Sequence, residues 1–380
     1  MNDRMSLALL AGVLLVLASV NAGAQATVTE DFTSGTTSNS WYYFNGACLT
    51  AGSAAGAGSP GSVPSCMTIM SSYYNQKRGG GYSGVSGNSS TLPDPIGNGA
   101  LRLTNGYPYG YAQNGAIVSA TPFPAGQGVQ VTFKTVTYRG NSGGGAKDGA
   151  DGISFYLMDG SQTPSLGAWG GSLGYTCSNT NTPYDGLVGG YLGLGIDEYG
   201  NFLNQYDNTA TGYGYVPGRI GLRGAGNVSW AYLNANYPAF YPSALTSAQR
   251  LAAVRSTCAS GTLWDYSQTT PVQATANGAT IPVMDYAVIP NAYQVLSGVQ
   301  IANESAMRRS QANPIYYKLR ITQNGLLSLS YSINNGAVYQ QVIRNQSIAA
   351  SNGPMPSTFR FGFAGSTGGS TNIHEILCFQ

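Results

Sequence analysis

Charged residues are scarce in this chain. Only 8% of its 380 residues are Asp, Glu, Lys or Arg, and the formal net charge is +2. So little charge argues against the basic surface with which proteins bind nucleic acid. It also argues against disorder driven by charge repulsion. We therefore expect a folded chain whose partners include no nucleic acid.

Long apolar runs are missing after the N-terminus. The single long run, residues 7–20, follows Arg4 and precedes small residues at positions 22, 24 and 26. This arrangement is typical of a cleaved secretory signal peptide. The run is short for an uncleaved membrane anchor, which needs about 20 apolar residues. We predict that residues 1–26 are a signal peptide, that the protein is secreted or reaches the cell surface, and that no membrane span remains after cleavage.

Glycine and tyrosine, in contrast, are abundant, with 53 and 27 residues. Glycine permits turns and close approaches of the backbone. Tyrosine suits half-buried strands and amphipathic binding surfaces. Together they indicate an all-β protein with many loops. The length allows one large β domain with insertions, or two domains.

Five cysteines leave one without a partner in the chain: Cys48, Cys66, Cys177, Cys258 and Cys378. In an exported protein we expect disulfides. Cys48 and Cys66 bracket a segment rich in small residues that could not pack a core, so we predict a local bridge there. Cys177 with Cys258 is the next most economical pair. Cys378 is either buried and free or paired with a cysteine outside this chain.

Alternating apolar and polar residues predict strands in several places. Residues 129–138 alternate in this way, as expected for a sheet with one wet face. Residues 317–332 predict a hairpin whose turn contains Asn324 and Gly325. Residues 27–98 are rich in loop formers, and residues 225–314 lack sustained alternation. We predict that 225–314 is an insertion with one short helix within 243–257.

A segment near the middle of the chain ends in hard oxygen donors. Residues 190–196 predict a strand with Leu192, Leu194 and Ile196 on one face. Oxygen donors follow in a short loop: Asp197, the carbonyl of Tyr199, Asn201 and Asp207. Such donors suit Ca²⁺, which takes roughly 6–8 oxygen ligands. A polar turn after a strand is the alternative interpretation.

Two further segments accompany this loop. Residues 147–157 contain Ala150-Asp151-Gly152, and residues 359–369 end in a glycine-rich turn that His374-Glu375 follows. In this order and spacing the three segments resemble the L-type (legume-type) lectins, over about residues 99–224 and 315–380. The resemblance implies a concanavalin A-like jelly-roll sandwich of two antiparallel sheets in a bacterial exported member. One lectin-like domain would then occupy residues 27–380.

The resemblance also implies the role of each site residue. Asp151 would follow a cis peptide and accept hydrogen bonds from two sugar hydroxyls, while Asn201 would bridge Ca²⁺ and sugar. The residues assigned to carbohydrate binding are Asp151, Gly170, Gly171, Tyr199, Asn201, Gly368 and Gly369. Those assigned to Ca²⁺ are Asp197, Tyr199, Asn201 and Asp207. Trp169 is a candidate for stacking on the sugar or for the core.

The match departs from the family at a second metal site. Legume lectins carry an acidic residue and a histidine there for a transition metal, and this chain has Gly195 and Arg219. We therefore expect a calcium-only arrangement. Asp207 also lies one place later than in many members.

Three functions remain open from the sequence. The first is calcium-dependent binding of a glycan or glycoconjugate, without catalysis, in a surface or pilus-associated adhesin that could belong to a larger surface assembly. The second is a glycoside hydrolase, which needs two carboxylates about 5–10 Å apart. Glu198, the only spare carboxylate near these residues, is expected to point away from Asp197, and His374 is interpreted as structural. The third is a protein-binding adhesion module with a non-functional sugar site.

Overall fold

The computed structural model describes most of the chain after the predicted signal peptide. The described residues are 27–56, 58–69, 92–108, 110–141, 149–205, 207–296 and 298–380. Residues 1–26, and residues 70–91 of the loop-rich segment 27–98, lie outside them. The division into a signal peptide and one domain over 27–380 therefore stays a prediction.

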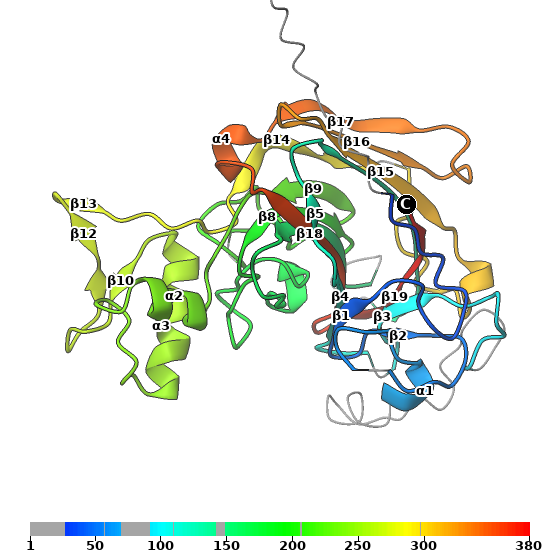
Figure 1. Ribbon diagram of the computed structural model, residues 1–380, viewed down its shortest axis with the longest axis horizontal. Coiled ribbons are helices and arrows are strands. Elements are labelled where there is room, and N and C mark those ends of the chain that lie inside the picture. Colours follow the sequence, from blue (N-terminus) through cyan, green and yellow to red (C-terminus); the bar gives the residue numbers. More distant parts are fainter. Residues whose placement is uncertain are drawn as a thin grey trace, which may run out of the picture.

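Two large antiparallel sheets form the framework, which confirms the predicted all-β sandwich (Figure 1). The eight-stranded sheet has the order β1-β4-β18-β7-β8-β9-β14, and β5 pairs with β18. Its strands are β1 (Trp41–Phe44), β4 (Asn114–Ser119), β5 (Phe123–Pro124), β7 (Gly152–Asp159), β8 (Gly190–Asp197), β9 (Arg219–Arg223), β14 (Val288–Val295) and β18 (Thr358–Ser366).

The seven-stranded sheet has the order β17-β16-β15-β6-β19-β3-β2. Its strands are β2 (Cys48–Leu49), β3 (Leu101–Thr104), β6 (Val129–Asn141), β15 (Ile315–Ile321), β16 (Leu326–Ser332), β17 (Gln340–Ser347) and β19 (Thr371–Phe379). Strand β15 alternates buried and half-buried side chains, with Tyr317 and Leu319 inside and Lys318 outside. One face of this sheet is therefore wet, as the alternation predicts. Strands β15 and β16 form the predicted hairpin.

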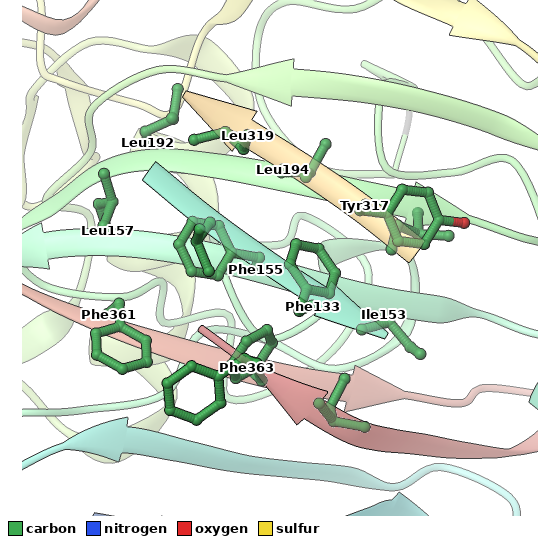
Figure 2. Close-up of a cluster of buried hydrophobic side chains, with 14 of the residues drawn as sticks. Phe133, Ile153, Phe155, Leu157, Leu192, Leu194, Tyr317, Leu319, Phe361 and Phe363 are labelled. Atoms are coloured by element: carbon green, nitrogen blue, oxygen red, sulfur yellow. The ribbon is translucent and has the colours of Figure 1, made fainter. Parts of the chain in front are cut away.

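The main core lies between the sheets and is rich in aromatic rings (Figure 2). Phe133 of β6 stacks on Phe155 of β7, with ring centroids 5.7 Å apart. It also meets Phe363 of β18 edge to face at 5.3 Å. Because Phe133 belongs to one sheet and its two partners to the other, these contacts hold the two layers together.

Glycines in β8 let a second core form on the other face of the eight-stranded sheet. A Cβ at Gly193 would lie 2.3 Å from the ring of Tyr175, and one at Gly195 would lie 2.2 Å from the ring of Phe202. Both rings are fully buried. The absence of side chains at Gly193 and Gly195 therefore allows these aromatic residues to pack directly on the strand.

Outside the sheets, the largest segment holds two helices and two small hairpins, at the left of Figure 1. These elements are α2 (Trp230–Asn236), α3 (Ser247–Ser260), β10 (Trp264–Asp265), β11 (Val272–Gln273), β12 (Thr275–Ala276) and β13 (Ala279–Thr280). We name residues 225–287 the helical insertion. The short elements elsewhere are α1 (Cys66–Ile69), η2 (Gly170–Ser172), η3 (Arg309–Gln311) and α4 (Ala349–Asn352).

The predicted bounds of the insertion need correction. The interval 225–314 includes β14, which pairs with β9 and belongs to the eight-stranded sheet. A register shift between Val288 and Tyr293 interrupts the alternation by which this strand could have been found. The one helix predicted within 243–257 corresponds to α3, which Thr246 and Gln249 cap reciprocally, and α2 was not predicted.

Both predicted disulfides are present, Cys48–Cys66 and Cys177–Cys258, and Cys378 is free and half-buried. The second bridge ties α3 of the helical insertion to the loop that follows η2. None of the helices in the ranges described above is both long and apolar enough to span a bilayer.

Removal of the Phe133 ring tests the aromatic core. Because Phe133 is fully buried between the sheets, Phe133→Ala should lower the free energy of unfolding by about 3–5 kcal/mol. The measurement is urea denaturation, read from the midpoint at unchanged slope. Arg344→Ala, an exposed change on β17, should stay within about 0.5 kcal/mol of the parent. Equal stability of the two variants would contradict this account of the core.

Candidate functional site

Asp151 stands at the start of β7, where three segments of the chain meet. The Ala150–Asp151 peptide is cis, as the resemblance implies. The Asp151 N–H donates to the carbonyl of Ser366 at 2.7 Å. Its own carbonyl accepts from the N–H groups of Glu198 at 3.0 Å and Tyr199 at 3.1 Å. The backbone of Asp151 is thus fixed between the end of β18 and the loop after β8.

The carboxylate of Asp151 is buried, with an exposed fraction of 4%. Its Oδ2 atom has no hydrogen-bond partner among the described residues. Burial raises the pKa of Asp151 well above its usual range, and the charges of Asp207, Asp197 and Glu198 raise it further. A buried carboxyl oxygen without a hydrogen-bond partner marks a place where a polar ligand or a cation would be stabilised.

The loop after β8 gathers the second carboxylate. One oxygen of Asp197 accepts from the N–H of Gly200 at 2.7 Å, and the other from the N–H of Phe202 at 2.8 Å. Burial nevertheless raises the pKa of Asp197 to about 7, because these hydrogen bonds and the charge of Arg219 only partly offset the desolvation. The loop is therefore shaped around an anion that it does not fully stabilise.

Asp207 supplies the third carboxylate. Its Oδ1 atom accepts from the Thr180 hydroxyl at 2.9 Å, whereas Oδ2 is buried and has no hydrogen-bond partner in the described chain. Burial raises the pKa of this group as well. Asn201 lies beside it, and the Oδ1 of Asn201 accepts from Asn204 at 2.9 Å.

Glycines let two other loops approach these groups. A Cβ at Gly171 would lie 2.3 Å from the Cβ of Asn201 and 2.6 Å from Oδ2 of Asp207. A Cβ at Gly368 would lie 3.0 Å from Oδ2 of Asp151. The loops that hold these glycines therefore lie directly against the carboxylates, with their backbones nearest.

Seven of the predicted residues lie together, in contact or as close neighbours along these loops: Asp151, Gly171, Asp197, Tyr199, Asn201, Asp207 and Gly368. The other two predicted residues do not touch the carboxylates. Gly170 faces the side chain of Asn181, and a Cβ at Gly369 would meet no atom within 4 Å. Trp169 is half-buried, and its indole N–H donates to the carbonyl of Thr182 at 3.0 Å.

A supporting layer behind Asp207 was not predicted. Thr180 donates to Asp207, and the N–H of Asn179 donates to the carbonyl of Asp207 at 3.2 Å. Arg255 of α3 donates to the carbonyl of Asn179 at 2.6 Å, close to the Cys177–Cys258 bridge. The helical insertion therefore supports the loop that holds Asp207. The predicted pairing of Cys177 with Cys258 was the only indication in the sequence that the insertion lies near the site.

Gly195 and Arg219, the two positions at which this chain departs from the resemblance, both lie close to the loop after β8. Phe202 fills the space beside Gly195. Arg219 is buried, and its charge acts on Asp197 to lower the pKa of that carboxyl. A buried guanidinium therefore lies near the carboxylate of Asp197.

Glu198 points away from the three carboxylates, as predicted. Its Oε2 atom lies 2.9 Å from Nε2 of His374 and accepts from Asn372 at 2.8 Å. His374 and Asn372 belong to β19 of the other sheet, so Glu198 is buried inside the sandwich. His374 has the structural position predicted for it. Glu198 is therefore not placed to act with Asp197 on a bound glycoside.

Calcium fits the donor set. In the ranges that the structure describes, no group of three or more His, Cys, Asp or Glu side chains is spaced to hold a metal. The set here instead combines the carboxylates of Asp197 and Asp207 with the amide of Asn201 and the carbonyl of Tyr199. These are hard oxygen donors of the kind that Ca²⁺ takes, and the unpartnered Oδ2 of Asp207 is free to bind it.

Comparisons with known proteins give structural likeness only. No protein-family model matches the sequence, and no curated protein matches it. The VIP36 exoplasmic/lumenal domain in its Ca²⁺/Man3GlcNAc-bound form is similar at 14% identity and a TM-score of 0.36, over 74% of this chain and 76% of that one. Lectin I-B4 of Griffonia simplicifolia, in a metal-free form, is similar at 13% identity and a TM-score of 0.39, over 74% of this chain and 86% of the lectin chain. Basic winged bean lectin with Tn-antigen is similar at 13% identity and a TM-score of 0.39, over 74% of this chain and 85% of the lectin chain.

The carboxylate cluster predicts an unusual pH dependence for the metal-free protein. Because the folded-state pKa of Asp197 is raised to about 7, the folded chain holds protons that the unfolded chain releases near pH 4. The binding of these protons stabilises the folded state fully at low pH, and this stabilisation is lost as pH rises through about 7. In a chelator, the melting temperature should be higher at about pH 5 than at about pH 8. Added Ca²⁺ should reduce the difference, and a chelated protein that is more stable at the higher pH would contradict this.

Gly171→Ala tests the close approach of the glycine loop. The added methyl would displace Asn201 or Asp207, so Ca²⁺ affinity should fall about 10- to 100-fold, as when other supporting groups of a metal site are disturbed. Calorimetric titration with calcium chloride measures it. The matched control is Gly369→Ala, whose Cβ has open space and should leave affinity unchanged. Equal affinities of the two variants would show that Gly171 does not position the donors.

Proposed function

We propose that this protein binds carbohydrate in a calcium-dependent manner. The observation that carries the proposal is the buried carboxylate of Asp151, whose Oδ2 atom has no hydrogen-bond partner in the described part of the chain and faces Gly368. Sugar hydroxyls are suitable donors for such an oxygen, because hydrogen bonds to an ionised acceptor are about twice as strong as neutral ones.

Calcium and sugar would share the loop after β8. Asp197, Asp207, Asn201 and the carbonyl of Tyr199 are the proposed metal ligands. When bound, the ion would neutralise the carboxylates and hold the loop in one shape. The amide N–H₂ of Asn201 would then donate to the sugar, and Asp151 would accept from two of its hydroxyls. The half-buried ring of Tyr199 offers an apolar face to the pyranose.

Binding without hydrolysis is the function we infer. The three carboxylates of the cluster are assigned to sugar or metal, and Glu198 is turned into the sandwich, where it contacts His374. A hydrolase would need a pair of carboxylates on either side of the scissile bond. This arrangement favours a lectin over a glycoside hydrolase.

We also propose that the protein acts outside the cytoplasm. Two disulfides suit an oxidising compartment, which supports the prediction that residues 1–26 direct export. Roles as a surface or pilus-associated adhesin, and in a larger surface assembly, stay predictions.

A glycan array tests the proposal. The purified protein should bind a class of glycans with Ca²⁺ present and lose that binding in a chelator. Asp151→Asn, which keeps the shape and removes the charge, should weaken binding about 10- to 100-fold, since hydrogen bonds to charged groups contribute about 1.5–3 kcal/mol. Asn201→Ala should weaken both sugar and Ca²⁺ binding.

The control for charge is Asp265→Asn, a half-exposed position on β10 of the helical insertion, and this variant should bind as the parent does. A folded protein that binds no glycan in either condition would contradict the proposal. That result would favour the protein-binding adhesion module instead.

A further inference from the structure

Three tyrosines near the candidate site keep much of their surface in water. Tyr213, Tyr215 and Tyr293 have exposed fractions of 39%, 45% and 37%. The first two lie in the loop that follows Asp207, and Tyr293 is on β14. We name these three residues the tyrosine ledge.

The ledge begins at the candidate site. The ring of Tyr215 meets the ring of Tyr199 edge to face, with centroids 5.5 Å apart. Tyr199 in turn donates its backbone N–H to Asp151. The next residue after Tyr215, Val216, donates its N–H to the carbonyl of Gly200 at 3.1 Å. The loop that holds the ledge therefore runs directly beside the proposed calcium loop.

The other two rings of the ledge, those of Tyr213 and Tyr293, pack on each other. The centroids of Tyr213 and Tyr293 are 4.6 Å apart, and the rings are inclined by 40°. The hydroxyl of Tyr213 accepts from the N–H of Asn291 at 3.3 Å. These contacts fix the two rings to each other, yet each remains more than one third exposed.

Hydrogen bonds hold the loop in place before any ligand arrives. The buried Arg219 donates to the carbonyl of Gly214 at 2.7 Å, and its guanidinium lies 5.7 Å from the ring centre of Tyr293. The N–H of Tyr213 donates to the carbonyl of Leu203 at 2.7 Å. Because the rings are already ordered, little conformational entropy would be lost when a ligand stacks on them.

The size of the ledge favours a sugar over a protein. A fully buried tyrosine covers roughly 150–250 Å², so three rings exposed by about 40% present on the order of 200–300 Å² in all. A stable protein interface needs about 800 Å² on each partner. One or two pyranose rings, each with an apolar C–H face and a polar rim, fit the smaller surface and the phenol hydroxyls around it.

We propose that Tyr213, Tyr215 and Tyr293 form a second saccharide subsite that is continuous with the one at Asp151. The preferred ligand is then an oligosaccharide whose terminal residue binds at Asp151 and whose following residues stack on the ledge. This inference rests on the proposed function. It also gives Arg219 the role of positioning the rings of the tyrosine ledge.

The test compares short and long ligands that share a terminal sugar. The probes are the methyl glycosides of mannose, glucose and galactose, and oligosaccharides that end in each, titrated with Ca²⁺ present. For the sugar that binds, the parent protein should prefer the oligosaccharide about tenfold or more, as one good aromatic contact of about 1.4 kcal/mol would give. Tyr213→Ala/Tyr293→Ala should lose that preference and keep its affinity for the methyl glycoside.

Matched variants separate stacking from other effects. Tyr213→Phe/Tyr293→Phe keeps the rings and should retain most of the preference. Tyr339→Ala, in the loop between β16 and β17 of the other sheet, should change neither affinity. Equal loss of both affinities in the double alanine variant would overturn the inference, because the tyrosines would then support the first subsite only.

Saturation-transfer NMR on the parent protein keeps the test decisive if the alanine variant does not fold. Saturation of the aromatic protons should reach the second sugar residue as well as the first. Transfer to the terminal sugar residue alone, or equal affinity for short and long ligands, would overturn the inference of a second subsite and leave the proposed function intact. Binding of neither ligand would instead contradict the proposed function itself.

Discussion

The arrangement of the site depends on the burial of three carboxylates in one place. Asp151 precedes β7, whereas Asp197 and Asp207 belong to the end of β8 and the loop after it, and burial raises the pKa of each. Two of them keep an oxygen without a partner among the described residues. Desolvated charges of one sign repel each other and must be neutralised by protons or by a cation. A site of this kind is therefore stable only when something positive or hydrogen-bonding is added to it, and calcium with a sugar would supply both.

The rest of the structure keeps these groups close together. Strand β8 places Asp197 at its end, and β7 beside it begins at Asp151. Glycine at 171 brings the η2 loop against Asp207, and the disulfide of Cys177 anchors that loop to α3. The helical insertion thus belongs to the architecture of the site although it lies outside both sheets. A rigid scaffold with loops held at its edge is the common way in which folds carry binding sites.

Arg219 connects the site to the surface beside it. Its charge lowers the pKa of Asp197. Its guanidinium also donates a hydrogen bond to the carbonyl of Gly214 and packs against the ring of Tyr293. One buried cation therefore acts on the carboxylate of Asp197 and also orders a loop that presents aromatic rings.

The sequence by itself determined the features that depend on residues close together along the chain. The alternation of β6 and the β15–β16 hairpin follow from the two-residue period of a strand. Asp197, Tyr199 and Asn201 could be assigned together because one short loop holds them. Only the tertiary structure decided that β14 completes a sheet, that Gly171 rather than Gly170 touches the carboxylates, and that Tyr213 meets Tyr293. Such contacts join residues far apart in the chain, and sheet register and side-chain packing set them, neither of which a local pattern records.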